Sequence, residues 1–251
     1  MNIDNCIDGK RAHSRAARLW LDVRVGFGFG LLALLLAQRV AFSSENAVPI
    51  APPALDEPVP AASAHEETAV FAGGCFWGVQ GVFQHVRGVK QAVSGYSGGQ
   101  RDTAHYETVS GGATGHAESV QVTFDPAQVT YGQLLQVYFS VIHDPTQLDR
   151  QGPDSGPQYR SAVFPLNDTQ RRVAQSYIAQ LDKAHTFPAP IVTKLEPFKG
   201  FYPAEFYHQN YLTEHPNSAY IALNDMPKVA SLKRLFPSLY RDKPVLVQVA
   251  R

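Results

Sequence analysis

The sequence predicts an α/β (α+β) fold: a two-layer sandwich with a mixed central sheet, helices packed on it, and long irregular loops. Stretches typical of strands alternate along the chain with stretches that repeat apolar residues at helical spacing. Some connections between strands are too short for a helical crossover, which argues against a purely parallel sheet. The chain has 251 residues, enough for one domain with a substantial core after an unusual N-terminus.

Composition and motifs argue against several classes of function. Acidic and basic residues balance at 22 each, so nothing suggests a nucleic-acid-binding surface. The histidines are scattered, and neither a His-Glu-x-x-His nor a Cys-x-x-Cys motif is present, so no metal site is assigned. The two cysteines, Cys6 and Cys75, allow a single disulfide at most. We expect a monomer that binds no nucleic acid.

Residues 1–42 form a basic leader with a short apolar segment at 25–37. This segment has the length of a signal-peptide core, and an uncleaved membrane anchor is the competing interpretation. Arg39 and the lack of a clear cleavage site weaken the first interpretation. We expect an exported protein, periplasmic or anchored in the inner membrane, with a cytoplasmic protein as the alternative. Cys6 precedes the apolar segment, so it is a poor disulfide partner for Cys75.

Composition divides the remaining chain into three parts. Residues 43–67 are rich in Ala, Pro and Glu, which predicts an extended linker that does not pack. The folded domain is predicted at 68–240, and residues 241–251 form a C-terminal tail.

The first half of the domain contains three predicted strands and two predicted helices. The β-prone residues 68–72 and the apolar alternation over 89–96 and 118–124 predict the strands. Apolar residues at helical spacing predict helices directly after Cys75 and over 131–142. The glycine-rich segment 97–115 is a long loop, and such loops are uncommon unless functional.

The second half continues this alternation after a polar loop at 146–158. Asn167 is a predicted helix N-cap because Gln170 follows three residues later and an apolar periodic stretch comes next. The remaining predicted elements are strands at 159–164 and 191–195, a helix at 207–215 and a short final helix at 225–235.

Cys75 lies where the first strand turns into the first helix. The two preceding glycines permit a tight turn. The free amides and the dipole of a helix N-terminus favour a thiolate over a thiol, so this position suits a reactive cysteine. The alternative is a small buried cysteine packed below the neighbouring aromatic residues, since free cysteines are among the most buried residues.

Glu118 begins the strand at 118–124 and is in phase with its apolar residues. A carboxylate on a core-facing row is costly to bury in its ionised form, so its pKa should rise. In its protonated form Glu118 could act as a general acid. The alternative is that Glu118 lies at a frayed strand end and faces solvent, since glutamate is rarely buried.

The residues around Cys75 resemble the signature of the A-type peptide methionine sulfoxide reductases, Gly-Cys-Phe-Trp-Gly at 74–78. Further segments match other blocks of that family in the same order, and the resemblance covers about residues 68–215. These blocks are Thr-Gly-His-Ala-Glu at 114–118, His-Asp-Pro-Thr-Gln at 143–147, Arg-Gln-Gly-Pro-Asp at 150–154, Gln-Tyr-Arg-Ser-Ala at 158–162 and Phe-Tyr-Pro-Ala-Glu at 201–205.

The resemblance implies that the domain at 68–240 reduces the S epimer of methionine sulfoxide, free or in proteins, and so repairs oxidised proteins. It implies Cys75 as the nucleophile at the sulfoxide sulfur and Glu118 as the proton donor to the oxygen. The remaining implied roles are hydrogen bonds to that oxygen from Tyr106 and Tyr159, organisation of the site by Asp154, and binding of the substrate methyl group by Phe76 and Trp77. No bound cofactor is implied, because sulfur carries the electrons.

The chain departs from many relatives in the second half of the reaction. The first half-reaction would leave Cys75 as a sulfenic acid and release methionine. Ser110 stands where many relatives have a resolving cysteine, and the C-terminal region contains no cysteine. We therefore expect a single-cysteine cycle completed by an external thiol: a thioredoxin-like protein, glutaredoxin with glutathione, or another dithiol.

Two other functions remain open from the residues alone. Cys75 could pair with His116 or His143 in a thiol hydrolase or acyltransferase. The chain could also be a non-catalytic module that binds oxidised methionine. Without the resemblance, Tyr106 and Tyr159 would be ordinary half-buried tyrosines.

Overall fold

The computed structural model describes residues 47–58 and 66–248. The strands of this part are β1 (Glu67–Gly73), β2 (Val89–Ser97), β3 (Ala117–Phe124), β4 (Arg150–Gln151), β5 (Asp154–Ser155), β6 (Ser161–Val163), β7 (Lys194–Leu195) and β8 (Phe201–Pro203). The longer helices are α2 (Phe76–Gln84), α4 (Tyr131–Val137), α5 (Asp168–Lys183) and α7 (Met226–Leu235). The short helical segments are η1 (Arg101–Thr103), α3 (Tyr106–Val109), η2 (Tyr138–Ile142), η3 (Pro157–Tyr159), η4 (Phe206–His208), α6 (Tyr211–Glu214) and η5 (Ile221–Asp225).

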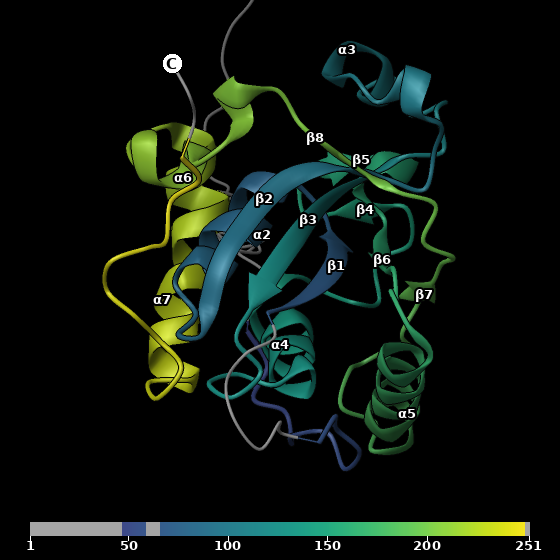
Figure 1. Ribbon diagram of the computed structural model, residues 1–251, viewed down its shortest axis with the longest axis vertical. Helices are drawn as coiled ribbons and strands as arrows, with labels where there is room; N and C mark the ends of the chain where they lie inside the picture. Colours follow the sequence, from purple (N-terminus) through teal and green to yellow (C-terminus); the bar gives the residue numbers. More distant parts are fainter. Residues whose placement is uncertain (1–46, 59–65, 249–251) are drawn as a thin grey trace, which may run out of the picture. The chain divides into compact units, whose positions relative to one another are not determined.

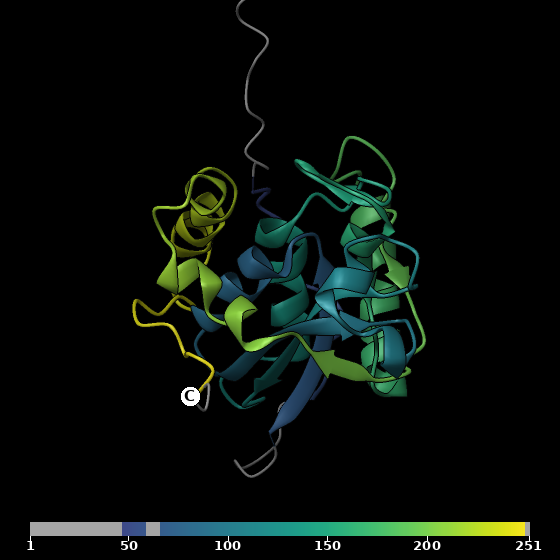
Figure 2. The ribbon, with the colours of Figure 1, turned by 90° about the horizontal axis from the view of Figure 1, so that it is seen from above.

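Within the described residues, a six-stranded sheet has the order β7-β6-β1-β3-β2-β8 (Figure 1). The β6–β7 pair is parallel, and the other neighbouring pairs are antiparallel. The predicted mixed sheet is therefore confirmed. Figures 1 and 2 agree in placing α7 and α5 at opposite ends of this sheet.

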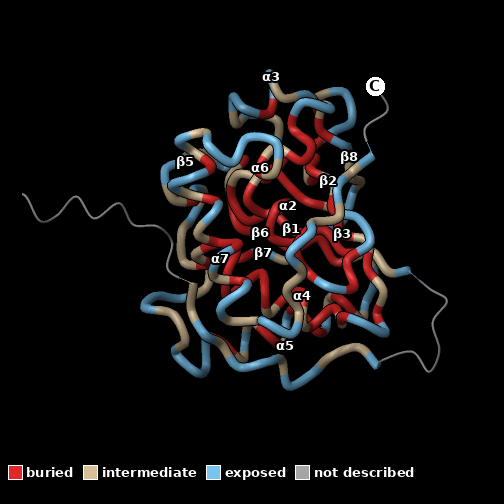
Figure 3. The backbone as a smooth tube through the Cα atoms, turned by 90° about the vertical axis from the view of Figure 1, so that its left-hand side faces the viewer, coloured by how far each residue is buried: buried red, intermediate tan, exposed pale blue. Residues whose placement is uncertain are grey.

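The main core lies between the sheet and the helices on one of its faces. The helix α2 packs on β1, β2 and β3. Phe71, Val120 and Val122 are fully buried on that side, because alternate residues of each strand point toward the helices. Figure 3 shows the buried backbone running through β1, β3 and α2. A smaller apolar cluster around Val70 and Phe164 covers the other face.

The helices begin where the side chains predict. Asn167 accepts a hydrogen bond from the Gln170 amide at 2.8 Å, which confirms it as the N-cap of α5. Thr130 and Gln133 form a reciprocal capping box at the start of α4. The helix predicted over 131–142 continues beyond α4 as the π-helical segment η2.

Several predicted boundaries were wrong in the second half of the domain. The loop at 146–158 contains the small ribbon of β4 and β5, and the helical turn η3 delays the strand predicted at 159 until Ser161. The strand predicted at 191–195 is reduced to β7. The helix predicted at 207–215 is split into η4 and α6, because Asn210 adopts a left-handed conformation with φ +58°. The strand β8 was not predicted.

The interpretation of residues 43–67 as an unpacked linker was wrong for the described residues 47–58. They form no helix or strand, but Val48 exchanges hydrogen bonds with Ser140, and Asp56 accepts one from the Gly132 amide at 2.8 Å. This segment therefore packs against the domain and covers the start of α4. The leader at 1–42 with its apolar segment lies outside the described residues. Among the described helices, none has the length and apolarity to cross a membrane.

Candidate active site

Cys75 stands at the junction of β1 and α2, as the sequence predicts. It is the N-cap residue of α2 and is half-buried. Gly74 makes the preceding turn with φ +89°, and a Cβ atom at this position would lie 2.6 Å from the side chain of Gln151. A glycine is therefore required both for the turn and for the close approach of Gln151 from the ribbon of β4 and β5. The result is a thiol at the edge of the core that is partly accessible to solvent.

Glu118 lies under the first turn of α2, so the alternative of a solvent-facing carboxylate is wrong. Its side chain is 3% exposed, and its Oε2 accepts a hydrogen bond from the Phe76 amide at 3.0 Å. Burial raises the pKa of Glu118 from its ordinary 4.5 to about 8, although this hydrogen bond opposes the rise. Glu118 is therefore protonated at neutral pH and available as a proton donor.

Tyr106 is half-buried at the start of α3 and is held there by Glu205. The Glu205 carboxylate accepts one hydrogen bond from the Tyr106 amide and another from the Tyr96 hydroxyl, each 2.9 Å long. Burial raises the pKa of Tyr106, and negative charge on Glu118 or Cys75, when either group ionises, raises it further. The Tyr106 hydroxyl therefore lies within the electrostatic field of both groups and stays protonated.

Tyr159 is half-buried at the end of η3 and has the same surroundings. Burial raises its pKa, with further contributions from the charges of Glu118, Asp154 and Cys75. The structure thus brings the two predicted tyrosines together around Cys75, although they are separated by more than fifty positions in the sequence.

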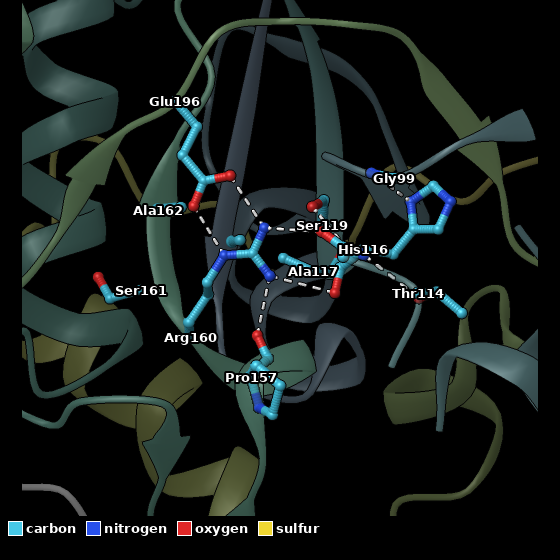
Figure 4. Close-up of polar contacts among 12 residues, drawn as sticks. Gly99, Thr114, His116, Ala117, Ser119, Pro157, Arg160, Ser161, Ala162 and Glu196 are labelled. Carbon is cyan, nitrogen blue, oxygen red and sulfur yellow. Dashed lines mark hydrogen bonds and ion pairs between the residues drawn. The ribbon is translucent and has the colours of Figure 1, made fainter. Parts of the chain in front are cut away.

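The next residue, Arg160, holds two parts of the site in place (Figure 4). Its guanidinium forms a bidentate pair with Glu196, with N–O distances of 2.7 and 2.9 Å. It also donates to the Pro157 carbonyl at 2.9 Å and to the His116 carbonyl at 3.1 Å. These bonds join the turn that carries Tyr159 to the residues just before Glu118. Arg160 was not predicted as a site residue.

Asp154 lies on the Cys75 side of the β4 ribbon and accepts a hydrogen bond from the Tyr220 hydroxyl. Burial raises the pKa of Asp154, while this hydrogen bond and the Lys228 charge oppose the rise. A narrow crevice opens here beside the thiol. Its lining residues are Cys75, Gln151, Gly152, Pro153, Asp154, Tyr220, Asn224 and Lys228.

Phe76 and Trp77 form an aromatic wall next to Cys75. Phe76 is buried, with its ring centroid 5.1 Å from that of His208. Trp77 stacks on Tyr211 at 3.8 Å and donates from Nε1 to His208 Nδ1 at 3.3 Å. The orientation of both predicted side chains is thus determined by residues from the C-terminal part of the domain.

His116 and His143 use their ring nitrogens elsewhere. The His116 ring bonds to the Gly99 amide and to a backbone carbonyl on the adjacent loop. The His143 ring bonds to the Ser161 hydroxyl at 2.7 Å and to the Tyr138 carbonyl at 3.1 Å. Burial also lowers the pKa of His143 to about 3. Neither ring is available as a base for Cys75, so a thiol hydrolase is disfavoured.

Comparison with known proteins gives a consistent result. The family model for peptide methionine sulfoxide reductase matches residues 67–238. A relative called peptide methionine sulfoxide reductase MsrA 2 from Mesorhizobium japonicum is 70% identical over 72% of this chain and 93% of its own length. The chain belongs to the peptide methionine sulfoxide reductase family.

Other family members agree in sequence and in fold. The MsrA 2 of Synechocystis is 50% identical over 74% of this chain and 85% of its own length. The structure of reduced Mxr1 from Saccharomyces cerevisiae aligns with a TM-score of 0.56 and 31% identity, covering 68% of this chain and 97% of that one. Methionine sulfoxide reductase A of Corynebacterium diphtheriae aligns with a TM-score of 0.54 and 32% identity, covering 69% of this chain and 90% of its own.

The protonation state of the cysteine in this reductase differs from the prediction. Burial raises the pKa of Cys75 well above its ordinary value, and the carboxyl groups of Glu118 and Asp225 raise it further. A hydrogen bond from the Trp77 backbone lowers the pKa but does not reverse the shift. The expected stabilisation of a thiolate by the helix N-terminus is therefore outweighed, and Cys75 is a thiol at neutral pH.

Sequence reasoning missed the residues around Cys75 that follow the last recognised motif. Tyr220, Asp225 and Lys228 lie beyond residue 215, where the resemblance ended. His208 and Tyr211 belong to an aromatic-rich stretch at 198–211, where only a helix at 207–215 was predicted. Both rings contact Trp77, but helical spacing could not have shown this, because the helix predicted over both residues is broken between them at Asn210.

Proposed function

We propose that this protein reduces the S epimer of methionine sulfoxide, free and in polypeptides, with Cys75 as the nucleophile. The observation that carries the proposal is the half-buried thiol beside a buried carboxyl group whose pKa is raised to about 8. A sulfoxide oxygen must be protonated to leave sulfur, and a neutral carboxylic acid supplies that proton near pH 7. Family membership supports the same reaction.

The first half-reaction transfers oxygen and two electrons. The Cys75 sulfur attacks the sulfoxide sulfur while Glu118 donates its proton to the oxygen, and the proton released by the thiol returns to Glu118. This attack forms a bond between the two sulfur atoms. That S–S bond and the S–O bond of the substrate then break as the oxygen passes to the Cys75 sulfur, which becomes a sulfenic acid. The substrate sulfur is reduced to methionine by two electrons, and the cysteine sulfur is oxidised by two.

The surrounding side chains bind the substrate in this proposal. The aromatic rings of Phe76 and Trp77 contact the methyl group, because an apolar wall favours the apolar end of the sulfoxide. Tyr106 and Tyr159 donate hydrogen bonds to the oxygen, since both hydroxyls stay protonated at neutral pH. Asp154 and Tyr220 form the other side of the crevice, and the hydrogen bond between them holds both side chains in place.

An external thiol completes the cycle. Cys75 is the only cysteine among the described residues, and Ser110 is exposed on the surface at the end of α3. The sulfenic acid would be attacked by the reductant thiol to give a mixed disulfide and water, and a second thiol of the reductant would release Cys75. A thioredoxin-like dithiol, or glutaredoxin with glutathione, has the required chemistry.

Single-turnover experiments test the first half-reaction. With methionine sulfoxide and no reductant, the protein should release about one methionine per chain and leave a Cys75 that reacts with dimedone. Cys75→Ser should abolish the release. Glu118→Gln should slow it by about 10²- to 10⁴-fold, the usual contribution of a general acid.

The exposed Glu107, adjacent to Tyr106, provides a matched control. Glu107→Gln should retain the wild-type rate, because it removes a carboxylate at the surface of the same region. An unchanged single-turnover rate in Glu118→Gln would remove Glu118 from the mechanism. Methionine release by Cys75→Ser would refute the nucleophile.

We also propose that the protein is exported, because basic residues precede the apolar segment at 25–37. The mass of the mature protein would reveal cleavage of the leader. An intact leader together with a cytosolic location would overturn this proposal.

A further inference from the structure

Asp225 is a buried carboxylate that the proposed reaction does not use. It ends η5, in the C-terminal segment that packs against α2, and its side chain is fully buried. It lies so close to Gly78 that a methyl group on Gly78 would overlap its Oδ1 atom. Gly78 is in the first turn of α2, three residues after Cys75. The carboxylate is therefore placed against the same helix N-terminus that carries the thiol.

An ion pair with Lys228 favours the charged form of this buried carboxylate. Lys228 Nζ is 3.4 Å from Oδ1, and apart from this ion pair neither oxygen accepts a hydrogen bond from the described residues. Burial raises the pKa of Asp225 to about 6, while Lys228 opposes the rise. Asp225 is thus ionised at neutral pH. The partial positive charge at the start of α2 also favours an anion at this position.

We propose that Asp225 is a positioning residue that holds Cys75 in its thiol form while no sulfoxide is bound, by opposing the positive end of α2. Two carboxyl groups occupy that helix end: Glu118 accepts the Phe76 amide, and Asp225 covers Gly78. These two carboxyl groups counteract the positive potential of the helix N-terminus, which would otherwise stabilise a thiolate at Cys75. The significance of this device for catalysis rests on the proposed function, but its effect on the thiol does not.

The other groups that face Cys75 leave Asp225 as a main source of negative charge. At neutral pH Glu118 and the neighbouring tyrosines are uncharged, whereas Asp225 is ionised and forms an ion pair with Lys228. The groups facing the thiol are Glu118 from β3, Asp154 from β5, Asp225 from η5, Lys228 from α7, and the hydroxyls of Tyr106, Tyr159 and Tyr220. After burial and the charge of Asp154, the Asp225 charge also raises the pKa of Glu118, so it favours the protonated form of both reacting groups.

The device would limit reaction with the wrong oxidant. Hydrogen peroxide oxidises a thiolate: the sulfur attacks one oxygen, the O–O bond breaks, and hydroxide leaves, which gives a sulfenic acid. A protonated Cys75 reacts slowly in this way. Reduction of the sulfoxide does not need a thiolate that is already formed, because Glu118 protonates the sulfoxide oxygen during the attack.

The pH dependence of Cys75 alkylation by iodoacetamide tests the proposal without any sulfoxide. The experiment uses the full chain with Cys6→Ser, so that Cys75 is the only thiol that iodoacetamide can alkylate. Asp225→Asn should move the alkylation midpoint to lower pH, and should raise the rates of alkylation and of peroxide oxidation at pH 7 by several-fold. Lys228→Gln should move the midpoint the opposite way, because it removes a positive charge from the crevice while Asp225 stays ionised at the alkaline pH of the midpoint.

Opposite shifts distinguish charge from disturbed packing, which would expose the thiol and accelerate both variants at every pH. An unchanged or higher midpoint in Asp225→Asn would overturn the proposal, and so would shifts of both variants in the same direction. Failure of methionine sulfoxide reduction with these shifts intact would refute only the proposed function.

Discussion

Replacing Glu118 by glutamine should stabilise the folded protein, and the gain should depend on pH. The folded state holds the Glu118 proton up to about pH 8, whereas the unfolded chain releases it near 4.5. Between these values the folded state binds more protons than the unfolded state, so the contribution of Glu118 to stability is lost as pH rises. A glutamine cannot ionise when the chain unfolds, and its oxygen can still accept the Phe76 amide hydrogen bond.

The size of the gain follows from the two pKa values. The gain in unfolding free energy at pH 7 depends on how far pH 7 lies above 4.5, the pKa of Glu118 in the unfolded chain. At about 1.36 kcal/mol for each pH unit, it is roughly 3 kcal/mol. At pH 4 the difference should vanish, and above pH 8 it should stop increasing. The buried amide hydrogens of glutamine lower the gain by about 1 kcal/mol at every pH if they find no acceptor.

Urea unfolding followed by tryptophan fluorescence at several pH values measures this difference. The exposed substitution Glu107→Gln is the control, and its unfolding free energy should follow that of the wild type. The reasoning fails if the Glu118→Gln difference is the same at pH 4 and pH 7, or if it decreases as pH rises. Such a result would mean that Glu118 is ionised in the folded protein and is not a neutral acid.

Three other predictions follow from the same geometry. The single-turnover rate of methionine release should fall as pH rises through about 8, where Glu118 loses its proton, and a rate that stays flat to pH 9 would contradict this. Gly74→Ala should cost at least roughly 1–2 kcal/mol of stability, because φ is +89° and the new Cβ atom would overlap the side chain of Gln151. The same substitution should slow the first half-reaction. Gly111→Ala is the matched control, because a Cβ atom there would make only an ordinary contact of 3.5 Å. Asp56→Ala should lower stability by about 1 kcal/mol through loss of its hydrogen bonds at the start of α4, with the single-turnover rate unchanged; a slower rate would connect the N-terminal segment to the site.

The sequence by itself determined the local framework of the site. The strand before Cys75 and the apolar spacing after it predict the β1–α2 junction, because each pattern depends only on residues that are neighbours in the chain. The two-residue alternation in β3 places Glu118 on the row of Val120 and Val122, and the structure buries it there. Asn167 as a helix cap is likewise a local property.

Tertiary structure alone decided the charge of the thiol and the contacts that orient its neighbours. The helix N-terminus predicts a thiolate, but burial and the carboxyl groups of Glu118 and Asp225 reverse that preference. The N-terminal segment at 47–58 packs on α4 although its composition is that of a linker. In these cases a pKa or a contact depends on groups brought together from distant parts of the chain, whereas a periodic pattern describes only the relation of a residue to its sequence neighbours.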